Sequence, residues 1–192
     1  MTATKKNEQA SKARIGSIGE NLVVNQLMQQ GWDAFNANCN IKNYKAIDVV
    51  CIDSDSSESK EKWWKPKIAL VQVKTCFQNN IPAGFTIEQT LDKDYLNKMV
   101  KGPYVFVYVQ QENGNYSFRY FVISRKQFIE LIHCAHVFYD KIHNGTEKKT
   151  APAGLFVSWL EGKPLFAPKT PVDFGNPLKE TCENKWENIW EE

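Results

Sequence analysis

Two apolar runs separated by a polar loop restrict the fold of this chain more than any other feature. Residues 46–52 and 68–75 are rich in β-branched side chains and predict two strands, whereas residues 53–60 contain no apolar side chain. We expect the two strands to form an antiparallel hairpin. If its midpoint lies near residue 60, Asp48 falls opposite Gln72, because both are equally far from that midpoint.

Three polar side chains interrupt these apolar runs. Asp48 lies within the first predicted strand, and Gln72 and Lys74 project to one face of the second, since side chains alternate along a strand. A charged side chain on a buried strand costs several kcal/mol unless it is paired, hydrated or bound to a metal. The alternative is that Asp48 caps a strand end and Lys74 lies at an edge.

A long amphipathic helix is predicted over residues 11–30, with Gly31 as its C-terminal cap. Glu20 lies at the edge of the apolar stripe of this helix, although it could be an ordinary surface residue. Gly16 and Gly19 lower helix propensity, which is consistent with a close approach of the helix to the sheet.

The rest of the chain alternates between helical and strand patterns. Further strands are expected at 32–35, 104–110, 116–123 and 155–160, and further helices at 88–101, 125–139 and 179–190. These patterns predict an α/β fold with a mixed central β-sheet flanked by helices. We expect one domain over residues 1–143, with its core at about 11–123, and a C-terminal extension over 144–192 that packs on the same domain.

The predicted site combines groups suited to a hard divalent cation. Asp48, the side-chain oxygen of Gln72 and the backbone carbonyl of Val73 could bind Mg²⁺ or Mn²⁺, with Glu20 holding a metal-bound water. Lys74 could orient or deprotonate the attacking water and stabilise negative charge in the transition state. These roles together are those of phosphodiester hydrolysis.

The order Glu20, Asp48, Gln72-x-Lys74 resembles the PD-(D/E)xK nuclease superfamily over about residues 11–123. Its core has a helix with Glu, a strand with Asp and a following strand with (D/E)-x-K. The resemblance implies a restriction-endonuclease-like core and a metal-dependent endonuclease acting on nucleic acid, with double-stranded DNA as the expected substrate. Ala46–Ile47 replaces the proline that often precedes the aspartate, and Gln72 replaces an acidic residue, although some enzymes of the superfamily use Gln there.

The glutamine leaves a second interpretation open, a catalytically inactive nuclease-like fold that serves as a nucleic-acid-binding or protein-interaction module. A coincidental pattern would be revealed if Asp48, Gln72 and Lys74 were not neighbours in the structure. Since cutting both strands of a duplex usually requires two sites, a homodimer is plausible, although no residue indicates one.

Several basic and aromatic residues are candidate nucleic-acid contacts: Lys42, Lys45, Trp63, Trp64, Arg119 and Arg125. The tryptophans could instead anchor a loop, and the arginines could lie on a solvated face. A basic N-terminal arm with Lys5, Lys6, Lys12 and Arg14 could add affinity for DNA or remain disordered. His133 and His136, on one predicted helix, favour packing over metal binding.

Composition places few further limits on function. The net charge of +2 neither requires nor excludes nucleic-acid binding. Five cysteines without C-x-x-C spacing, three of them in apolar segments, predict reduced thiols and a cytoplasmic protein. No apolar run approaches the roughly 18 residues of a membrane span, and the polar start is unlike a signal peptide, so we expect neither membrane insertion nor secretion.

Overall fold

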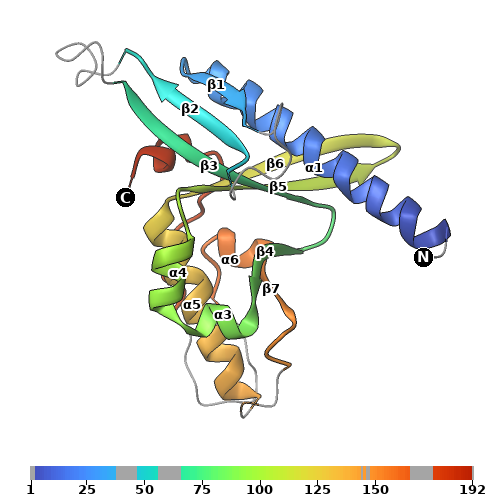
Figure 1. The fold of residues 1–192 in the computed structure, drawn as a ribbon, viewed down its shortest axis with the longest axis vertical. Helices are drawn as coiled ribbons and strands as arrows, with labels where there is room; N and C mark the ends of the chain where they lie inside the picture. Colours follow the sequence, from blue (N-terminus) through green and yellow to red (C-terminus); the bar gives the residue numbers. More distant parts are fainter. Residues whose placement is uncertain are drawn as a thin grey trace.

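A five-stranded mixed sheet with helices on both faces forms the centre of the molecule (Figure 1). The computed structural model describes residues 3–37, 47–55, 66–143, 145, 148–164 and 175–191, with residues 3–12 described by their backbone alone. Its helices and strands are α1 (Ala3–Gln29), β1 (Asp33–Asn36), β2 (Val49–Asp53), β3 (Lys67–Cys76), β4 (Asn80–Thr86), α3 (Ile87–Leu91), α4 (Lys93–Met99), β5 (Tyr104–Glu112), β6 (Asn115–Ile123), α5 (Arg125–Ile142), β7 (Pro152–Phe156), α6 (Val157–Leu160) and the 3₁₀-helix η1 (Trp186–Trp190). The predicted α/β class with a mixed sheet is confirmed.

The sheet has the strand order β1-β2-β3-β5-β6. Only β3 and β5 pair in parallel, and the other neighbours are antiparallel. Asn113 and Gly114 connect β5 to β6 with φ angles of 52° and 81°, which is the backbone of a tight hairpin turn. The strands predicted at 104–110 and 116–123 are therefore confirmed, and they form an antiparallel hairpin. β4 and β7 form a separate two-stranded sheet.

Helix α1 covers one face of the sheet. It is longer at its start than the apolar periodicity predicted, and it ends before Gly31, whose φ of 89° is the left-handed conformation of a C-terminal cap. Gly19 lies directly over Thr75 of β3: a Cβ atom added there would come within 2.8 Å of the Thr75 Cβ. The missing side chain thus permits the close packing of α1 on β3.

The opposite face packs on a larger core built from the small sheet and helices α3 to α6. Tyr104 and Phe106 of β5 stack with Phe128 of α5, and the Tyr104 and Phe128 ring centroids are 3.8 Å apart. Ser124 caps α5: its side chain accepts a hydrogen bond from the Gln127 N–H, and the Gln127 side chain accepts one from the Ser124 N–H.

Several sequence predictions differ from the structure. The strand predicted at 155–160 is instead the end of β7 followed by helix α6 over Val157–Leu160. The helix predicted at 88–101 is divided into α3 and α4 by Asp92, whose extended backbone and carboxylate begin a second helix. The strand β4 was not predicted, since Pro82 and Gly84 indicate a loop. The predicted helix at 179–190 is only the short η1, although Trp186 is buried and Trp190 packs edge-on against Trp32, as expected for a packing stripe.

The strand at 68–75 was predicted to be buried, and this prediction is wrong for its first half. Ile68 and Leu70 are 55% and 37% exposed, and Phe35 of β1 is 51% exposed. Within the described ranges, β1, β2 and this half of β3 are packed on one face only, against α1. Separately, no helix among the described residues has both the length and the apolar character needed to cross a membrane.

The contact between Gly19 and Thr75 gives a testable prediction. Gly19→Ala places a methyl group against a short side chain that cannot move away, so we expect a loss of about 1–3 kcal/mol in the free energy of unfolding. Gly16→Ala is the matched control on the same helix, because a Cβ atom there meets open space; it should stabilise by up to about 1 kcal/mol. Urea denaturation followed by circular dichroism measures both, and equal effects would contradict the packing described.

Candidate functional site

The strands that carry the predicted site pair in the predicted register. β2 and β3 are antiparallel with Val49 opposite Val71, so their hairpin is centred on residue 60. Asp48, however, lies one residue before β2 rather than in the middle of a strand, which corrects the sequence prediction. Its backbone N–H donates to the Val71 carbonyl at 3.0 Å. Asp48 therefore lies beside the residue 71–73 segment of β3, which contains Gln72.

The Asp48 carboxylate is held by the backbone of β3. Its Oδ2 atom accepts a hydrogen bond from the Val73 N–H at 2.8 Å, and the side chain is partly buried. Hydrogen bonds to a charged acceptor are stronger than neutral ones. The bond fixes the carboxylate next to Val73, which lies between Gln72 and Lys74 in the sequence.

The backbone of β3 faces two different neighbours on its two edges. The Gln72 N–H donates to the Pro103 carbonyl at 3.0 Å, on the β5 side, whereas the Val73 N–H points to Asp48. Since the N–H and C=O of one residue point to the same side of a strand, the Val73 carbonyl is directed toward the Asp48 side as well. The backbone oxygen predicted as a ligand thus lies on the edge of β3 that bears the carboxylate.

Tyr104 supports the site from β5, where it pairs with Gln72. It is 2% exposed, and its pKa is raised well above the ordinary value, first by burial and then by the negative charge of Asp48. Tyr104 therefore stays a neutral phenol near the carboxylate. The sequence analysis identified the strand but not this role, because the role depends on pairing between distant segments.

Lys74 projects from the same face as Gln72 and is half-buried. The end of its side chain lies against Gly84 of β4: a Cβ atom added at Gly84 would be 3.5 Å from Lys74 Cε and 4.0 Å from Nζ. The φ of Gly84 is 90°, a conformation that glycine adopts without strain. The ammonium group therefore occupies space between the large and the small sheet.

Glu20 of α1 is joined to the site through β1. Its Oε2 atom accepts a hydrogen bond from Asn36 Nδ2 at 2.7 Å, and Asn36 pairs with Val49, the residue after Asp48. The Ala37 N–H donates to the Asp48 carbonyl at 2.9 Å, so β1 and Asp48 are also linked directly. The sequence analysis missed Asn36, because it lies just beyond the strand predicted at 32–35.

The structure thus places Asp48 beside the stretch of β3 that bears Gln72 and Lys74, and Asn36 of β1 connects Glu20 to the same end of the hairpin. These residues carry carboxylate, amide and carbonyl oxygens and an ammonium group, which are the types of group that bind cations and anionic substrates. Among the described residues, no group of three or more His, Cys, Asp or Glu side chains could hold a metal ion. Side-chain carboxylates alone therefore do not form a site here.

The candidate nucleic-acid contacts have different surroundings. Lys42, Lys45, Trp63 and Trp64 lie outside the described residues. Arg119 donates to both carboxylate oxygens of Glu183, at 2.8 and 2.6 Å, and to Glu161 at 2.7 Å.

Arg125 donates to the carbonyls of Asn97 and Val100 at the end of α4. Both arginines therefore have structural partners. The two histidines also pack within the fold: His133 Nδ1 lies 2.9 Å from the Thr90 carbonyl oxygen, and His136 is buried, which lowers its pKa.

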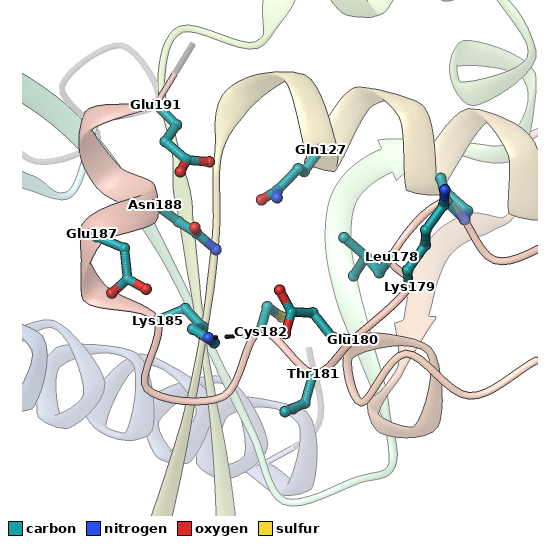
Figure 2. Close-up of a pocket in the computed structure, with 11 residues that line it drawn as sticks. Gln127, Leu178, Lys179, Glu180, Thr181, Cys182, Lys185, Glu187, Asn188 and Glu191 are labelled. Atoms are coloured by element: carbon teal, nitrogen blue, oxygen red, sulfur yellow. Dashed lines mark ion pairs between the residues drawn. The ribbon is translucent and has the colours of Figure 1, made fainter.

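A separate pocket lies at the C-terminal segment (Figure 2). It has a volume of about 310 Å³ and is lined by residues 177–191 together with Gln127 of α5. Lys185 and Glu180 form an ion pair at 4.0 Å across its edge. None of the residues predicted for the β2–β3 site lines this pocket, so the two places are distinct.

Comparisons with models of protein families, with curated proteins and with solved structures found no match to this chain. The chemistry of the site therefore has to be inferred from the geometry and the sequence pattern.

The contacts of Arg119 predict that it stabilises the fold by holding the C-terminal segment on β6. Replacing it by methionine leaves the partly buried carboxylate of Glu183 without this partner and leaves Glu161 paired with Lys163 alone. We therefore expect a loss of about 1–3 kcal/mol in the free energy of unfolding at pH 7. Lys93→Met is the matched control, since Lys93 forms an exposed ion pair with Glu130 and should contribute less than about 1 kcal/mol.

The effect of Arg119→Met should depend on pH. Hydrogen bonds from Lys163, and then from Arg119, lower the pKa of Glu161 below its ordinary value. Because the pKa of Glu161 is lower in the folded than in the unfolded protein, the ionised carboxylate stabilises the fold above its unfolded pKa of about 4.3. This stabilisation is lost as the pH falls through the lower pKa of the folded protein. Urea denaturation should therefore show the difference between wild type and variant narrowing below about pH 4. A difference that is constant between neutral and acidic pH would contradict the assignment.

Proposed function

We propose that this protein is a divalent-metal-dependent endonuclease that hydrolyses phosphodiester bonds in nucleic acid, with double-stranded DNA as its substrate. The observation that carries the proposal is the Asp48 carboxylate, held by the Val73 N–H at 2.8 Å on the strand that bears Gln72 and Lys74. A carboxylate at the edge of β3 and an ammonium group on a neighbouring residue of that strand suit a reaction that needs both a cation and charge stabilisation at a phosphate.

The donor atoms fit a hard cation. Asp48, the Gln72 amide oxygen and the Val73 carbonyl are oxygen ligands, and Mg²⁺ or Mn²⁺ prefers such ligands together with several waters. These three groups would hold the cation. When bound, the cation would polarise the scissile phosphate and lower the pKa of a coordinated water.

The remaining residues have roles that their positions support. The Lys74 ammonium lies between the two sheets beside Gly84, where it can orient the attacking water and stabilise the added negative charge on the phosphate. Glu20 can accept a hydrogen bond from a water at the end of β1. Asn36 Nδ2 donates to Glu20 at 2.7 Å and acts as a positioning residue for this carboxylate.

The order of the elements also supports the proposal. A helix with Glu20 is followed by Asp48 before β2, by Gln72 and Lys74 on β3, and then by further helices and β5. This is the order that the resemblance to the PD-(D/E)xK superfamily implies, and we propose that the core is restriction-endonuclease-like. Cutting both strands of a duplex would then use two copies of the site, in a homodimer.

Gln72 favours a second candidate function, a nuclease-like fold that binds nucleic acid or protein without cleaving it. A neutral amide in place of a carboxylate removes one negative charge from the site and weakens its attraction for a cation. The two functions differ in whether the site binds a divalent metal, which experiments can measure.

Plasmid cleavage tests the proposed activity. Wild-type protein with supercoiled plasmid and Mg²⁺ or Mn²⁺ should produce nicked or linear DNA, and EDTA should abolish cleavage. Asp48→Ala and Lys74→Ala should each reduce the rate by about a hundredfold or more, since each removes a group that acts on the reacting phosphate. Lys126→Ala, at an exposed position on α5, is the control for Lys74 and should cleave normally. Equal nicking by wild type, Asp48→Ala and Lys74→Ala would rule out this site.

Metal titration tests the role of Gln72. If the site is competent, Mg²⁺ should raise the unfolding temperature, and Gln72→Glu should lower the apparent Kd for Mg²⁺ by on the order of tenfold, because it adds a charged oxygen ligand. Asp48→Ala, introduced into the wild type or into Gln72→Glu, should abolish the rise in unfolding temperature with Mg²⁺. An unfolding temperature that does not respond to Mg²⁺ in the wild type would favour the non-catalytic module.

A further inference from the structure

A groove lies between the first part of α1 and the β5–β6 hairpin, which project to the same side of the sheet (Figure 1). We call it the α1–hairpin groove; its volume is about 380 Å³. It is lined by Arg14 and Ile18 of α1, by Thr75 and Phe77 at the end of β3, and by Tyr116 and Phe118 of β6. None of the proposed catalytic residues lines it.

Exposed aromatic rings form one wall of the α1–hairpin groove. Phe77 is 42% exposed and Tyr116 is 56% exposed, and their ring centroids are 6.0 Å apart. Ile18 on the opposite wall is 45% exposed. Aromatic rings with free faces are the usual platforms on which unpaired nucleic-acid bases stack. Paired bases in a duplex do not offer their faces in this way.

The charge beside the groove is complementary to phosphate. Arg14 lines the groove, and its side chain is exposed. Basic side chains that accompany aromatic rings are the combination by which proteins hold single strands. The groove therefore suits an anionic chain that carries flat apolar groups.

The groove is continuous with the proposed catalytic strand. Phe77 follows Lys74 by three residues, about 10 Å along a strand at about 3.3 Å per residue. The register of β2 with β3 ends at Val49–Val71, so among the described strands the part of β3 beyond Val73 pairs only with β5. A nucleic-acid strand that leaves the site at Lys74 can therefore pass this edge of β3 and reach the face of the sheet that α1 covers.

We propose that the α1–hairpin groove binds a single-stranded segment of nucleic acid, with unpaired bases on Phe77 and Tyr116 and a phosphate toward Arg14. The inference rests on the proposed nuclease function in one respect, that this segment belongs to the substrate cleaved at the β2–β3 site. The preferred substrate among double-stranded DNAs is then a duplex with a single-stranded extension.

Binding of an oligothymidylate of about 12 nucleotides, within the range of known single-strand site sizes, tests the proposal. Fluorescence anisotropy is measured in EDTA, with a blunt duplex of the same length for comparison. Wild type should bind the single strand more tightly than the duplex. Phe77→Ala/Tyr116→Ala should weaken single-strand binding by at least about tenfold, and Arg14→Gln should reduce the slope of log K against log salt by about 0.7.

Phe35→Ala is the matched control, because Phe35 is an aromatic residue of β1 with similar exposure, 51%, and does not line the groove. It should bind the oligonucleotide as wild type does. Thermal unfolding verifies that each variant is folded. A double variant that binds as tightly as wild type overturns the proposal, as does a wild type that does not bind the single strand. If the wild type is a dimer and the double variant is a monomer that still binds the oligonucleotide as wild type does, the groove binds a second copy of the chain instead.

The assay separates this proposal from the proposed enzyme activity, because binding in EDTA does not require cleavage. If the double variant loses oligonucleotide binding while wild type nicks no plasmid, the groove assignment holds and the nuclease assignment fails. If the plasmid is cleaved in an Asp48-dependent way but groove variants bind normally, the groove assignment alone fails.

Discussion

β3 changes its partner midway along its length, and the position of the candidate site depends on this change. Its first half pairs with β2, and its second half pairs in parallel with β5. Where β2 begins, the backbone N–H of Val73 has a side chain as its acceptor, the carboxylate of Asp48. Because buried backbone donors need an acceptor, an aspartate at this point both completes the strand edge and places a negative charge there. The structural and chemical roles of Asp48 have the same geometric origin.

Much of the large sheet could be predicted from sequence because its signals are local. The turn at Asn113-Gly114, the cap at Ser124, the end of α1 at Gly31 and the hairpin register about residue 60 all follow from residues near one another in the chain. The small sheet could not be predicted, since β4 and β7 are far apart in sequence and Pro82 and Gly84 resemble a loop. The same is true of the C-terminal segment, where the Val122 N–H donates to the Cys182 carbonyl.

The candidate site shows the same division between local and distant information. Asp48, Gln72 and Lys74 were identifiable because a polar residue in an apolar strand is unusual in any fold. Asn36, Tyr104 and Gly84, which surround them, have no such signal: an asparagine after a short strand and a glycine near a proline occur in most proteins. Asp48 itself was placed in the middle of a strand because the apolar run extends on both sides of it, whereas β2 begins only at Val49.

The contact of Lys74 with Gly84 makes the small sheet part of the environment of the ammonium group. β4 is held by its antiparallel pairing with β7, with Ile81 opposite Leu155, and not by the strands that carry Asp48. The surface beside the Lys74 ammonium group therefore belongs to a different sheet from the strands that carry Asp48 and Lys74. A shift of β7 would change the space around Lys74 while leaving the Asp48 carboxylate in place. The distance between the Lys74 ammonium group and the Asp48 carboxylate therefore depends on how the two sheets pack, and not on the β2–β3 hairpin alone.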